Sequence, residues 1–536
     1  MSADNMSHLT EPAASLRGSR PVVLRLAFTC WLIFTLHFAT NMVRETYLAL
    51  AIGDDLSFRV DPYANLHDDL FEHPGHGWHI GSNPGASMIG AIPYAISRPL
   101  IDRVVAAVQR GRQQRSDTEP PAYDAPTDTD RRFYEEAWKR GLDVKFGLAS
   151  LVMQSFAMAV TSALGVVVMY LVLASLLRSP RTALWLAVLY AFGTPVFFRT
   201  GFLNHNLMLA HTGLIGFALL WDVWRWRSAS LIRRFFLAGL AGGISLLLDY
   251  SGFIFLVGLW TYGVLKNRSP TGAAGLLRHS TAYAAGALGP VLLLWFYQWS
   301  SFGHPFLPPQ HWMPPVPWID LGYLGVVLPQ RELAAALAFD YRFGLFVSCP
   351  LFLLAFAAPF ARRDPRCIPC AELIACFAIF IAFFTFFSSV HHVRWQFNTG
   401  VRYLAPVFPF LFLLTAVVLL RLRPLAVRLI GIASITLAWS MAMVRDVSGG
   451  KVDVTEPDVG LGVLDPLLTV LLTGFKLPAL TTVSRMEAYQ DFVRDDVSAL
   501  PLLALAAAIL LAVWLPRPDR RSRPRAGQAS DTDPLP

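Results

Sequence analysis

Long apolar runs separated by short polar segments dominate this chain. Many of the runs have roughly the 17 to 25 residues that an α-helix needs to cross the hydrocarbon core of a bilayer. A membrane β-barrel would instead show shorter segments in which apolar and polar residues alternate. The pattern therefore predicts an all-α polytopic membrane protein, a bundle of about 12 transmembrane helices. The predicted spans are residues 22–42, 151–177, 182–198, 207–223, 235–248, 251–265, 279–299, 343–360, 369–389, 403–420, 427–443 and 499–515.

Basic residues follow alternate spans, and this fixes the expected orientation. Lys and Arg concentrate in the cytoplasmic loops of membrane proteins. With the N-terminus inside, every basic cluster falls on the cytoplasmic side, and twelve crossings return the C-terminus to that side. We therefore expect a bacterial inner-membrane protein with both termini in the cytoplasm. The clusters are Arg17, Arg20 and Arg25, Arg178 and Arg181, Arg225 and Arg227, Arg362 and Arg363, Arg421 and Arg423, and the tail Arg517–Arg525.

Two of the predicted spans are short and meet at Asp249 and Tyr250. Spans 235–248 and 251–265 carry basic residues at both of their far ends. A hairpin that dips into the membrane from the cytoplasm fits this charge pattern.

The spans and loops define the expected organisation of the chain. A cytoplasmic tail (1–21) precedes a transmembrane core (22–444), which includes a large first periplasmic loop (43–147). Within that loop, residues 110–130 are rich in Gln, Arg, Asp, Pro and Thr, a composition that predicts a mobile segment. A periplasmic or interfacial segment (445–498), a last transmembrane helix (499–515) and a disordered basic cytoplasmic tail (516–536) follow.

Composition supports the membrane interpretation. The chain has 536 residues, of which 54% are hydrophobic and only 15% charged, and its mean hydropathy is +0.46. These values exclude an ordinary water-soluble domain. The net charge of +8 lies in short clusters between apolar runs, which indicates membrane orientation rather than nucleic-acid binding.

Acidic residues gather in the first outer loop. The segment from Arg44 to Tyr94 contains several acids, and a carboxylate held at a membrane surface, partly shielded from water, can have a raised pKa and act as a general base. These acids are Glu45, Asp54, Asp55, Asp61, Asp68, Asp69 and Glu72. The alternative is that most of these acids are solvated loop charges. His67, Asp69, His73, His76 and His79 also lie close in sequence, but no known zinc spacing connects them. We expect no metal site and no cofactor, while the sequence leaves a divalent cation open.

Two polar residues lie at the edges of apolar segments. His205 opens the span 207–223, and Asp249 lies at the apex of the short hairpin. A polar group in a membrane needs a partner, water or a function. Each could therefore line a site or be a structural residue with satisfied hydrogen bonds.

Two arginines lie on the outer side, against the inside preference. Arg394 and Arg402 flank an outer loop, and Tyr403 and an apolar helix follow Arg402 directly. The planar guanidinium group suits a phosphate, and a helix N-terminus adds backbone donors. Interfacial snorkelling beside aromatic residues is the alternative explanation; we favour an anion site.

The order of several weak motifs resembles the bacterial polytopic GT-C glycosyltransferases, of mannosyltransferase-like type. The likeness covers residues 22 to about 420. Its motifs are Asn83-Pro84-Gly85-Ala86-Ser87 with Pro93-Tyr94, Gly193-Thr194-Pro195 before Asn204-His205, Asp249-Tyr250, Phe302-Gly303-His304-Pro305-Phe306, Gly344-Leu345-Phe346 with Pro350, and Gly400-Val401-Arg402-Tyr403 with Pro406 and Pro409.

This resemblance implies that a sugar passes from a polyprenyl-phosphate carrier to an envelope glycan, lipid or protein on the periplasmic side. It also implies a base in the first outer loop and basic residues around the lipid phosphate. The Asp-Glu pair of the family reads Arg44-Glu45 here, which leaves Glu45, Asp61 and Asp69 as alternative bases. The expected substrate or phosphate contacts are Arg44, His205, Asp249, Arg394, Arg402 and Tyr403.

Two other functions compete with sugar transfer. A transporter or flippase of lipid-linked substrates could also contain short broken helices and an acid such as Asp249. A transporter, however, should have charged groups around a midplane site, whereas here they gather at the outer rim. A non-catalytic envelope protein is the second alternative, and Arg44 in place of an acid is its main support.

Overall fold

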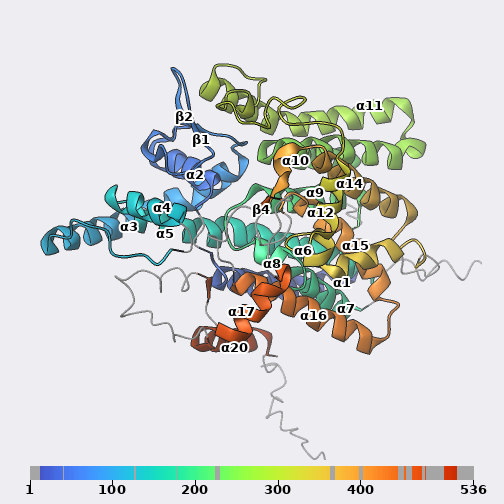
Figure 1. Ribbon diagram of the computed structural model, residues 1–536. Coiled ribbons are helices and arrows are strands. Elements are labelled where there is room, and N and C mark those ends of the chain that lie inside the picture. The colour runs from blue at the N-terminus through green and yellow to red at the C-terminus, as the bar shows by residue number, and fades with distance from the viewer. Residues whose placement is uncertain are drawn as a thin grey trace, which may run out of the picture.

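The computed structural model describes residues 13–39, 42–125, 128–177, 179–223, 230–361, 368–396, 402–444, 452–453, 461–473, 477–478 and 500–515. Helices dominate this part of the chain (Figure 1). The predicted all-α class is thereby confirmed. The strands form two small antiparallel pairs, in which β1 (Leu70–His73) pairs with β2 (Gly77–Ile80) and β3 (Trp395–Gln396) pairs with β4 (Val452–Asp453).

The longer helices account for most of the described residues. They are α1 (Ala13–Leu36), α2 (Arg44–Asp55), α3 (Gly85–Arg115), α4 (Asp128–Lys139), α5 (Asp143–Met153), α6 (Ala159–Leu176), α7 (Pro180–Phe192), α9 (His205–Trp221), α10 (Leu231–Leu248), α11 (Phe253–Phe302), α14 (Cys370–Ser388), α15 (Phe408–Leu419), α16 (Pro424–Met443) and α20 (Leu500–Trp514).

Short helical elements connect them. They are η2 (Asp61–Tyr63), the π-helical turn η3 (Gln154–Met158), α8 (Val196–Arg199), η4 (Tyr250–Gly252), η5 (Pro309–His311), α12 (Arg331–Phe339), α13 (Leu345–Ser348), η6 (Pro350–Ala357), η7 (His391–Arg394), η8 (Ala405–Val407), η9 (Gly462–Leu464) and α17 (Asp465–Thr473).

Five helical segments among the described residues are long and apolar enough to cross a membrane. They are Asp143–Leu176, Leu231–Leu248, Gly272–Phe302, Cys370–Ser388 and Pro424–Met443. The chain is thus a multi-pass membrane protein, whereas the predicted count of twelve spans is not confirmed.

Some predicted spans are divided into shorter helices. The segment 182–198 ends as α7 at Phe192, and α8 begins only after Pro195. With 13 residues, α7 is about 20 Å long, shorter than the hydrocarbon core. The segment 343–360 likewise contains two short helices, α13 and η6. Apolar composition alone did not reveal these breaks.

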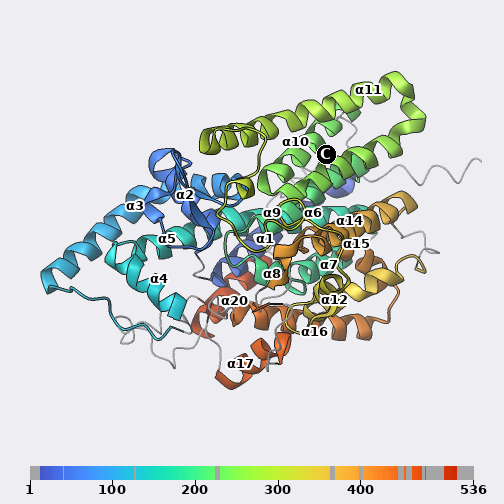
Figure 2. The ribbon, with the colours of Figure 1, turned by 45° about the horizontal axis from the view of Figure 1, so that its top comes forward.

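The long helix α11 is two arms joined at Gly272. This residue has φ 62° and ψ 179°, which is not a helical conformation and which glycine adopts readily. The chain reverses there, and the two arms run back alongside each other and alongside α10 (Figure 2). The predicted spans 251–265 and 279–299 lie in different arms. Span 235–248 lies in α10, which ends at Leu248 just before Asp249, as the sequence indicated.

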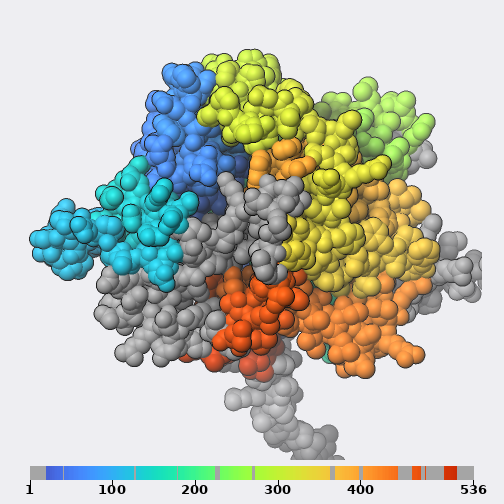
Figure 3. Space-filling model, in the orientation of Figure 1, coloured from blue at the N-terminus to red at the C-terminus, as the bar shows by residue number. Residues whose placement is uncertain are grey.

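The predicted first outer loop is a folded subdomain of helices α2 to α4, the start of α5 and the β1–β2 hairpin. Asp54 at the end of α2 ties three of these elements together. Its carboxylate accepts hydrogen bonds from Tyr63 Oη at 3.2 Å and Tyr94 Oη at 2.7 Å, and lies 2.7 Å from Lys145 Nζ. The segment 110–130, predicted to be mobile, is helical to Arg115 and again from Asp128. In Figure 3 the end of this subdomain protrudes beside the main body.

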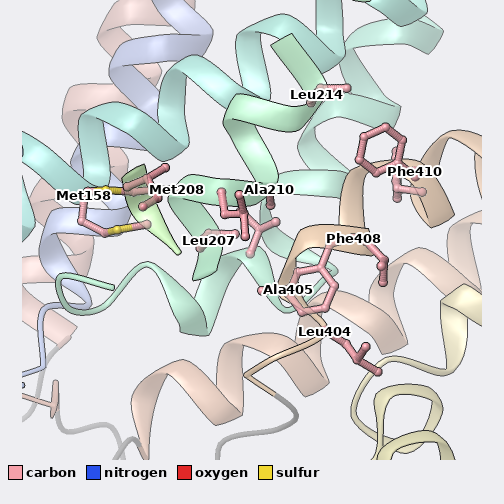
Figure 4. Close-up of a cluster of buried hydrophobic side chains, with 14 of the residues drawn as sticks. Met158, Leu207, Met208, Ala210, Leu214, Leu404, Ala405, Phe408 and Phe410 are labelled. Carbon is pink, nitrogen blue, oxygen red and sulfur yellow. The ribbon is translucent and has the colours of Figure 1, made fainter. Parts of the chain in front are cut away.

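A buried apolar contact joins two distant parts of the chain. The first turns of α9, with Leu207, Met208 and Leu214, pack beside the segment that begins α15, with Leu404 and Phe408 (Figure 4). All five side chains are at most 1% exposed. This contact fixes the polar residues that immediately precede each segment, His205 and the pair Arg402-Tyr403.

Close packing between α10 and α11 predicts a sharp difference between two glycines. A Cβ atom on Gly286 would lie 2.0 Å from the carbonyl oxygen of Phe236, whereas one on Gly289 would meet nothing within 4 Å. We expect Gly286→Ala to lower the free energy of unfolding by about 1–3 kcal/mol, because the backbones must separate. Gly289→Ala should change it by less than about 0.5 kcal/mol. Detergent-based unfolding titrations measure both, and equal effects would contradict this packing.

Candidate functional site

A cavity of about 1770 Å³ opens between the subdomain of α2 to α4 and the helical bundle. Its walls come from segments far apart in the sequence: the start of α2, the turns around β1 and β2, the start of α9, the Asp249 turn, residues 306–326 and the segment before α15. Residues 306–313 close one side, since Gln310 Nε2 donates to the carbonyl oxygen of Gly81 at 3.0 Å. In Figure 3 these residues, yellow-green, lie against the blue first subdomain.

Most of the predicted site residues line this cavity. Those that do are Arg44, Glu45, Asp69, His205, Asp249, Arg402 and Tyr403. The structure thereby brings together acids from residues 45, 69 and 249 with a guanidinium group from residue 402.

Asp61 and Arg394 lie outside the lining of the cavity. The Asp61 carboxylate pairs with Arg59 Nε at 2.8 Å and accepts from the backbone N–H of Trp78 at 2.8 Å, so it stabilises the β1–β2 hairpin. Arg394 donates from Nη2 to Gln330 Oε1 at 2.5 Å. Both residues were predicted from their position in outer loops, and position in a loop does not determine which way a side chain points.

Glu45, His205 and Asp249 form a row. His205 Nδ1 lies 2.6 Å from Glu45 Oε1, and His205 Nε2 lies 3.5 Å from Asp249 Oδ2. The side chains of Glu45 and His205 are only 5% and 8% exposed, while that of Asp249 is 27% exposed. The imidazole thus links a buried carboxylate to one that reaches the cavity.

Arg44 lies between two acids of the site. Its Nε is 3.4 Å from Glu45 Oε1, and its Nη1 is 3.2 Å from Asp69 Oδ2. Burial by itself raises the pKa of Glu45, but the Arg44 charge and the His205 hydrogen bond outweigh it and hold that pKa well below its usual range. Burial opposes the charge of Arg44, yet Asp69 and Glu45 raise its pKa. Arg44 and Glu45 are therefore both charged at neutral pH.

The cationic side of the cavity contains Arg402 and Arg199. Arg402 donates from Nη2 to the Tyr403 hydroxyl at 2.7 Å, and its guanidinium carbon lies 4.6 Å from the centre of the Tyr403 ring. Arg199 lies at the end of α8 and is 2% exposed. Within the described ranges no carboxylate lies within 4 Å of the Arg199 guanidinium, and its Nε has no hydrogen-bond partner.

Burial and the charge of Arg402 lower the pKa of Arg199 to about 9. The side chain thus stays largely protonated at neutral pH, although it is almost completely buried. A buried, unneutralised cation beside a second cation is costly unless an anion binds between them. This side of the cavity therefore suits an anionic ligand.

His392 on η7 links the two sides. Its ring centre lies 5.7 Å from that of Tyr403, and it lines the cavity. Burial lowers the pKa of His392 to about 4, with the charges of Arg402 and Arg44 acting in the same direction and Asp249 and Asp69 opposing them. The acidic and basic groups are thus close enough to act on one imidazole.

Sequence reasoning missed Arg199 and His392. Arg199 carries the same signal that pointed to Arg402, a basic residue on the outer side of the predicted topology. It follows the Gly193-Thr194-Pro195 motif and precedes Asn204-His205. His392 had no distinguishing signal, because its neighbour His391 is equally polar and only the fold directs one ring into the cavity.

The histidines of the first loop separate into two groups. His67 lines the cavity beside Asp69, whereas His73, His76 and His79 belong to the β1–β2 hairpin region. His73 stacks on His76 and contacts Trp312, with ring centres 4.8 Å apart in both cases. In the part of the chain that the structure describes, no group of three or more potential ligands is arranged to hold a metal ion.

Comparison with known proteins gives structural neighbours only. No protein-family model and no curated protein sequence matches the chain. Among solved structures it is similar to ArnT from Cupriavidus metallidurans bound to undecaprenyl phosphate, with a TM-score of 0.47 and 15% identity over 92% of this chain and 75% of that one. The apo form of ArnT gives the same TM-score and identity over 93% and 76%.

A third similar structure is the archaeal oligosaccharyltransferase AglB from Archaeoglobus fulgidus, in complex with an inhibitory peptide and a dolichol-phosphate. Its TM-score is 0.41 and its identity 13%, over 82% of this chain and 56% of that one. The geometry of the cavity is what bears on function.

The environment of His392 predicts a pH dependence of stability. Its pKa is about 4 in the folded protein and about 6.5 in an unfolded chain, so unfolding takes up a proton between these values. The contribution of neutral His392 is complete above pH 6.5 and is lost as the pH falls towards 4. We expect the free energy of unfolding of His392→Gln to fall less steeply over this window. Exposed His311→Gln is the control, and parallel curves for wild type and His392→Gln would contradict the assignment.

Proposed function

We propose that this protein transfers a sugar from a polyprenyl-phosphate carrier to an envelope acceptor, on the periplasmic side of a bacterial inner membrane. The observation that supports it is one cavity with carboxylates on one side and buried, unneutralised guanidinium charge on the other. Such a cavity suits a donor with an anionic leaving group and an acceptor that must lose a proton.

The donor phosphate binds at Arg199 and Arg402 in this proposal. A phosphate placed between them neutralises the buried Arg199 and takes several charge-assisted hydrogen bonds. The Tyr403 hydroxyl, which already accepts from Arg402, orients that guanidinium group. Apolar residues at the same cavity, among them Phe386 and Phe387 at the outer end of α14, offer a surface for the isoprenoid chain.

The acceptor faces the carboxylates. Asp69 and Asp249 have side chains 40% and 27% exposed and can reach a substrate, whereas Glu45 is 5% exposed and held by Arg44 and His205. A base at Asp69 or Asp249 removes the proton from the acceptor hydroxyl as its oxygen attacks the anomeric carbon. The bond from that carbon to the phosphate oxygen breaks, and the added negative charge on the lipid phosphate is stabilised by Arg199 and Arg402.

A binding protein without transfer activity is the second candidate. Arg44 contacts both Glu45 and Asp69, so it partly neutralises the acids that line the cavity. A protein that only binds or presents a lipid phosphate needs the cationic side and not a base. Binding and transfer must therefore be measured separately.

The cationic side predicts how lipid phosphate binds. We expect Arg199→Gln to weaken binding of undecaprenyl phosphate in nanodiscs by about 10- to 100-fold, since hydrogen bonds to charged groups contribute about 1.5–3 kcal/mol. The exposed Arg331→Gln variant should bind like wild type. Titration followed by native mass spectrometry measures the dissociation constants. Unchanged binding in Arg199→Gln would rule out this phosphate site.

The acidic side of the cavity leads to a prediction about which carboxylates are required for sugar transfer. In proteoliposomes with undecaprenyl-phosphate-linked glucose, mannose or galactose and envelope acceptors, the double variant Asp69→Asn with Asp249→Asn should lose at least about 100-fold in rate. It should still bind undecaprenyl phosphate. Asp61→Asn, whose carboxylate lies outside the cavity, should transfer at close to the wild-type rate.

The two outcomes separate the candidate functions. Wild-type protein that binds lipid phosphate but transfers none of these sugars would favour the binding protein. A full rate in the double variant would exclude both carboxylates as the base.

A further inference from the structure

We propose that Asp249 and His205 together take up the acceptor proton, and that Glu45 positions His205 for this task. This inference rests on the proposed sugar transfer and names the groups that handle its proton. Asp249 touches the substrate, His205 stores the proton, and Glu45 acts through His205. The proposal is based on the row that Glu45, His205 and Asp249 form at the cavity wall.

Glu45 determines which nitrogen of His205 carries hydrogen. An ionised carboxylate accepts hydrogen bonds only, so the 2.6 Å contact requires that Nδ1–H donates to Glu45 Oε1. In the neutral imidazole the other nitrogen, Nε2, then carries a lone pair. That lone pair faces Asp249 Oδ2 at 3.5 Å. The imidazole is therefore prepared to receive a proton from the direction of the cavity.

Asp249 is held in a matching orientation. Its Oδ1 accepts from the backbone N–H of Ser251 at 2.8 Å and from the Ser251 hydroxyl at 2.5 Å, and this turns Oδ2 towards His205. Within the described ranges no Arg or Lys nitrogen lies within 4 Å of the Asp249 carboxylate. The separation of 3.5 Å is longer than a normal hydrogen bond, and a proton between the two atoms would shorten it.

The position of His205 is rigid. His205 is the first residue of α9, and the preceding Asn204 caps this helix by accepting from the Leu207 N–H at 3.0 Å. The next residues belong to the buried contact with the start of α15. Because its backbone and Glu45 already hold the imidazole in place, the ring needs little reorganisation when it takes up a proton.

The proton step balances in charge. The acceptor O–H gives its proton to Asp249 as the oxygen forms the bond to the anomeric carbon, and the proton passes on to His205 Nε2. The electron pair of the broken bond leaves with the phosphate, which gains one negative charge beside Arg199 and Arg402. His205 becomes an imidazolium between the carboxylates of Glu45 and Asp249, and deprotonation by water after product release restores it.

Asp69 contacts different groups. Its Oδ2 lies 4.0 Å from His67 Nδ1, a nitrogen that already accepts the backbone N–H of Asp69 at 3.0 Å. Asp69 also pairs with Arg44. The proposal therefore rests on the row of Glu45, His205 and Asp249.

Nuclear magnetic resonance of ¹⁵N-histidine-labelled full-length protein in nanodiscs tests the resting arrangement without any substrate. The His205 signals, assigned by their loss in His205→Asn, should show a protonated Nδ1 with a strong hydrogen bond and an unprotonated Nε2 near pH 8. Glu45→Gln should abolish the strong hydrogen bond, and Asp55→Asn, an exposed acid on the same helix, should not. A protonated Nε2 and bare Nδ1 in wild type would overturn the proposal whether or not the protein transfers sugar.

Kinetics test the proton step. Glu45→Gln should lower the transfer rate, because the imidazole loses the acceptor that holds its Nδ1–H. The rate should drop at least about 100-fold in Asp249→Asn. In both variants the dissociation constant of undecaprenyl phosphate should be unchanged. Glu45→Asp should restore part of the wild-type rate, which a purely structural role of Glu45 would not do.

The outcomes separate this inference from the proposed function. An active wild type whose transfer rate is unchanged in Glu45→Gln would overturn the proton step and leave sugar transfer standing. A wild type inactive with all three donors would overturn both.

Discussion

The packing of α9 against the start of α15 is the contact on which the site depends. It joins residues about 200 positions apart, 207–214 and 404–410, through side chains that are almost completely buried. In a membrane this contact depends on close van der Waals packing, because lipid tails are as apolar as the side chains. His205 lies directly before the first of these segments and Arg402 directly before the second. A shift of either helix would therefore separate the two sides of the cavity.

The charged groups of the cavity are separated by sign, with net negative charge on one side and net positive charge on the other. Arg44, Glu45 and Asp69 partly neutralise one another, and Asp249 adds negative charge on the same side. Arg199 and Arg402 add positive charge on the other. Glu45, His205 and Arg199 are almost completely buried, which strengthens the electrostatic interactions that they make. A cavity of this kind favours a ligand that is itself divided into an anionic part and a proton-donating part.

Arg44 changes the chemistry that the neighbouring acid can perform. A glutamate with a depressed pKa remains ionised and is a weak base, but it is a good hydrogen-bond acceptor. The role left to Glu45 is to hold and polarise His205. The ion pair of Arg44 with Glu45 and the imidazole that links Glu45 to Asp249 are therefore consistent with each other.

The sequence by itself determined the membrane class and the helical fold, because length and apolarity of a segment are local properties. It also identified Glu45, Asp69, His205, Asp249 and Arg402 as candidate site residues, because polar groups beside apolar segments need a partner or a function. Only the tertiary structure decided which of them meet. Asp61 and Arg394 face other partners, Arg199 and His392 join the cavity, and α7 and α8 divide a run that looked continuous. The physical reason is that the direction of a side chain depends on the packing of helices distant in sequence, and composition and spacing carry no record of that packing.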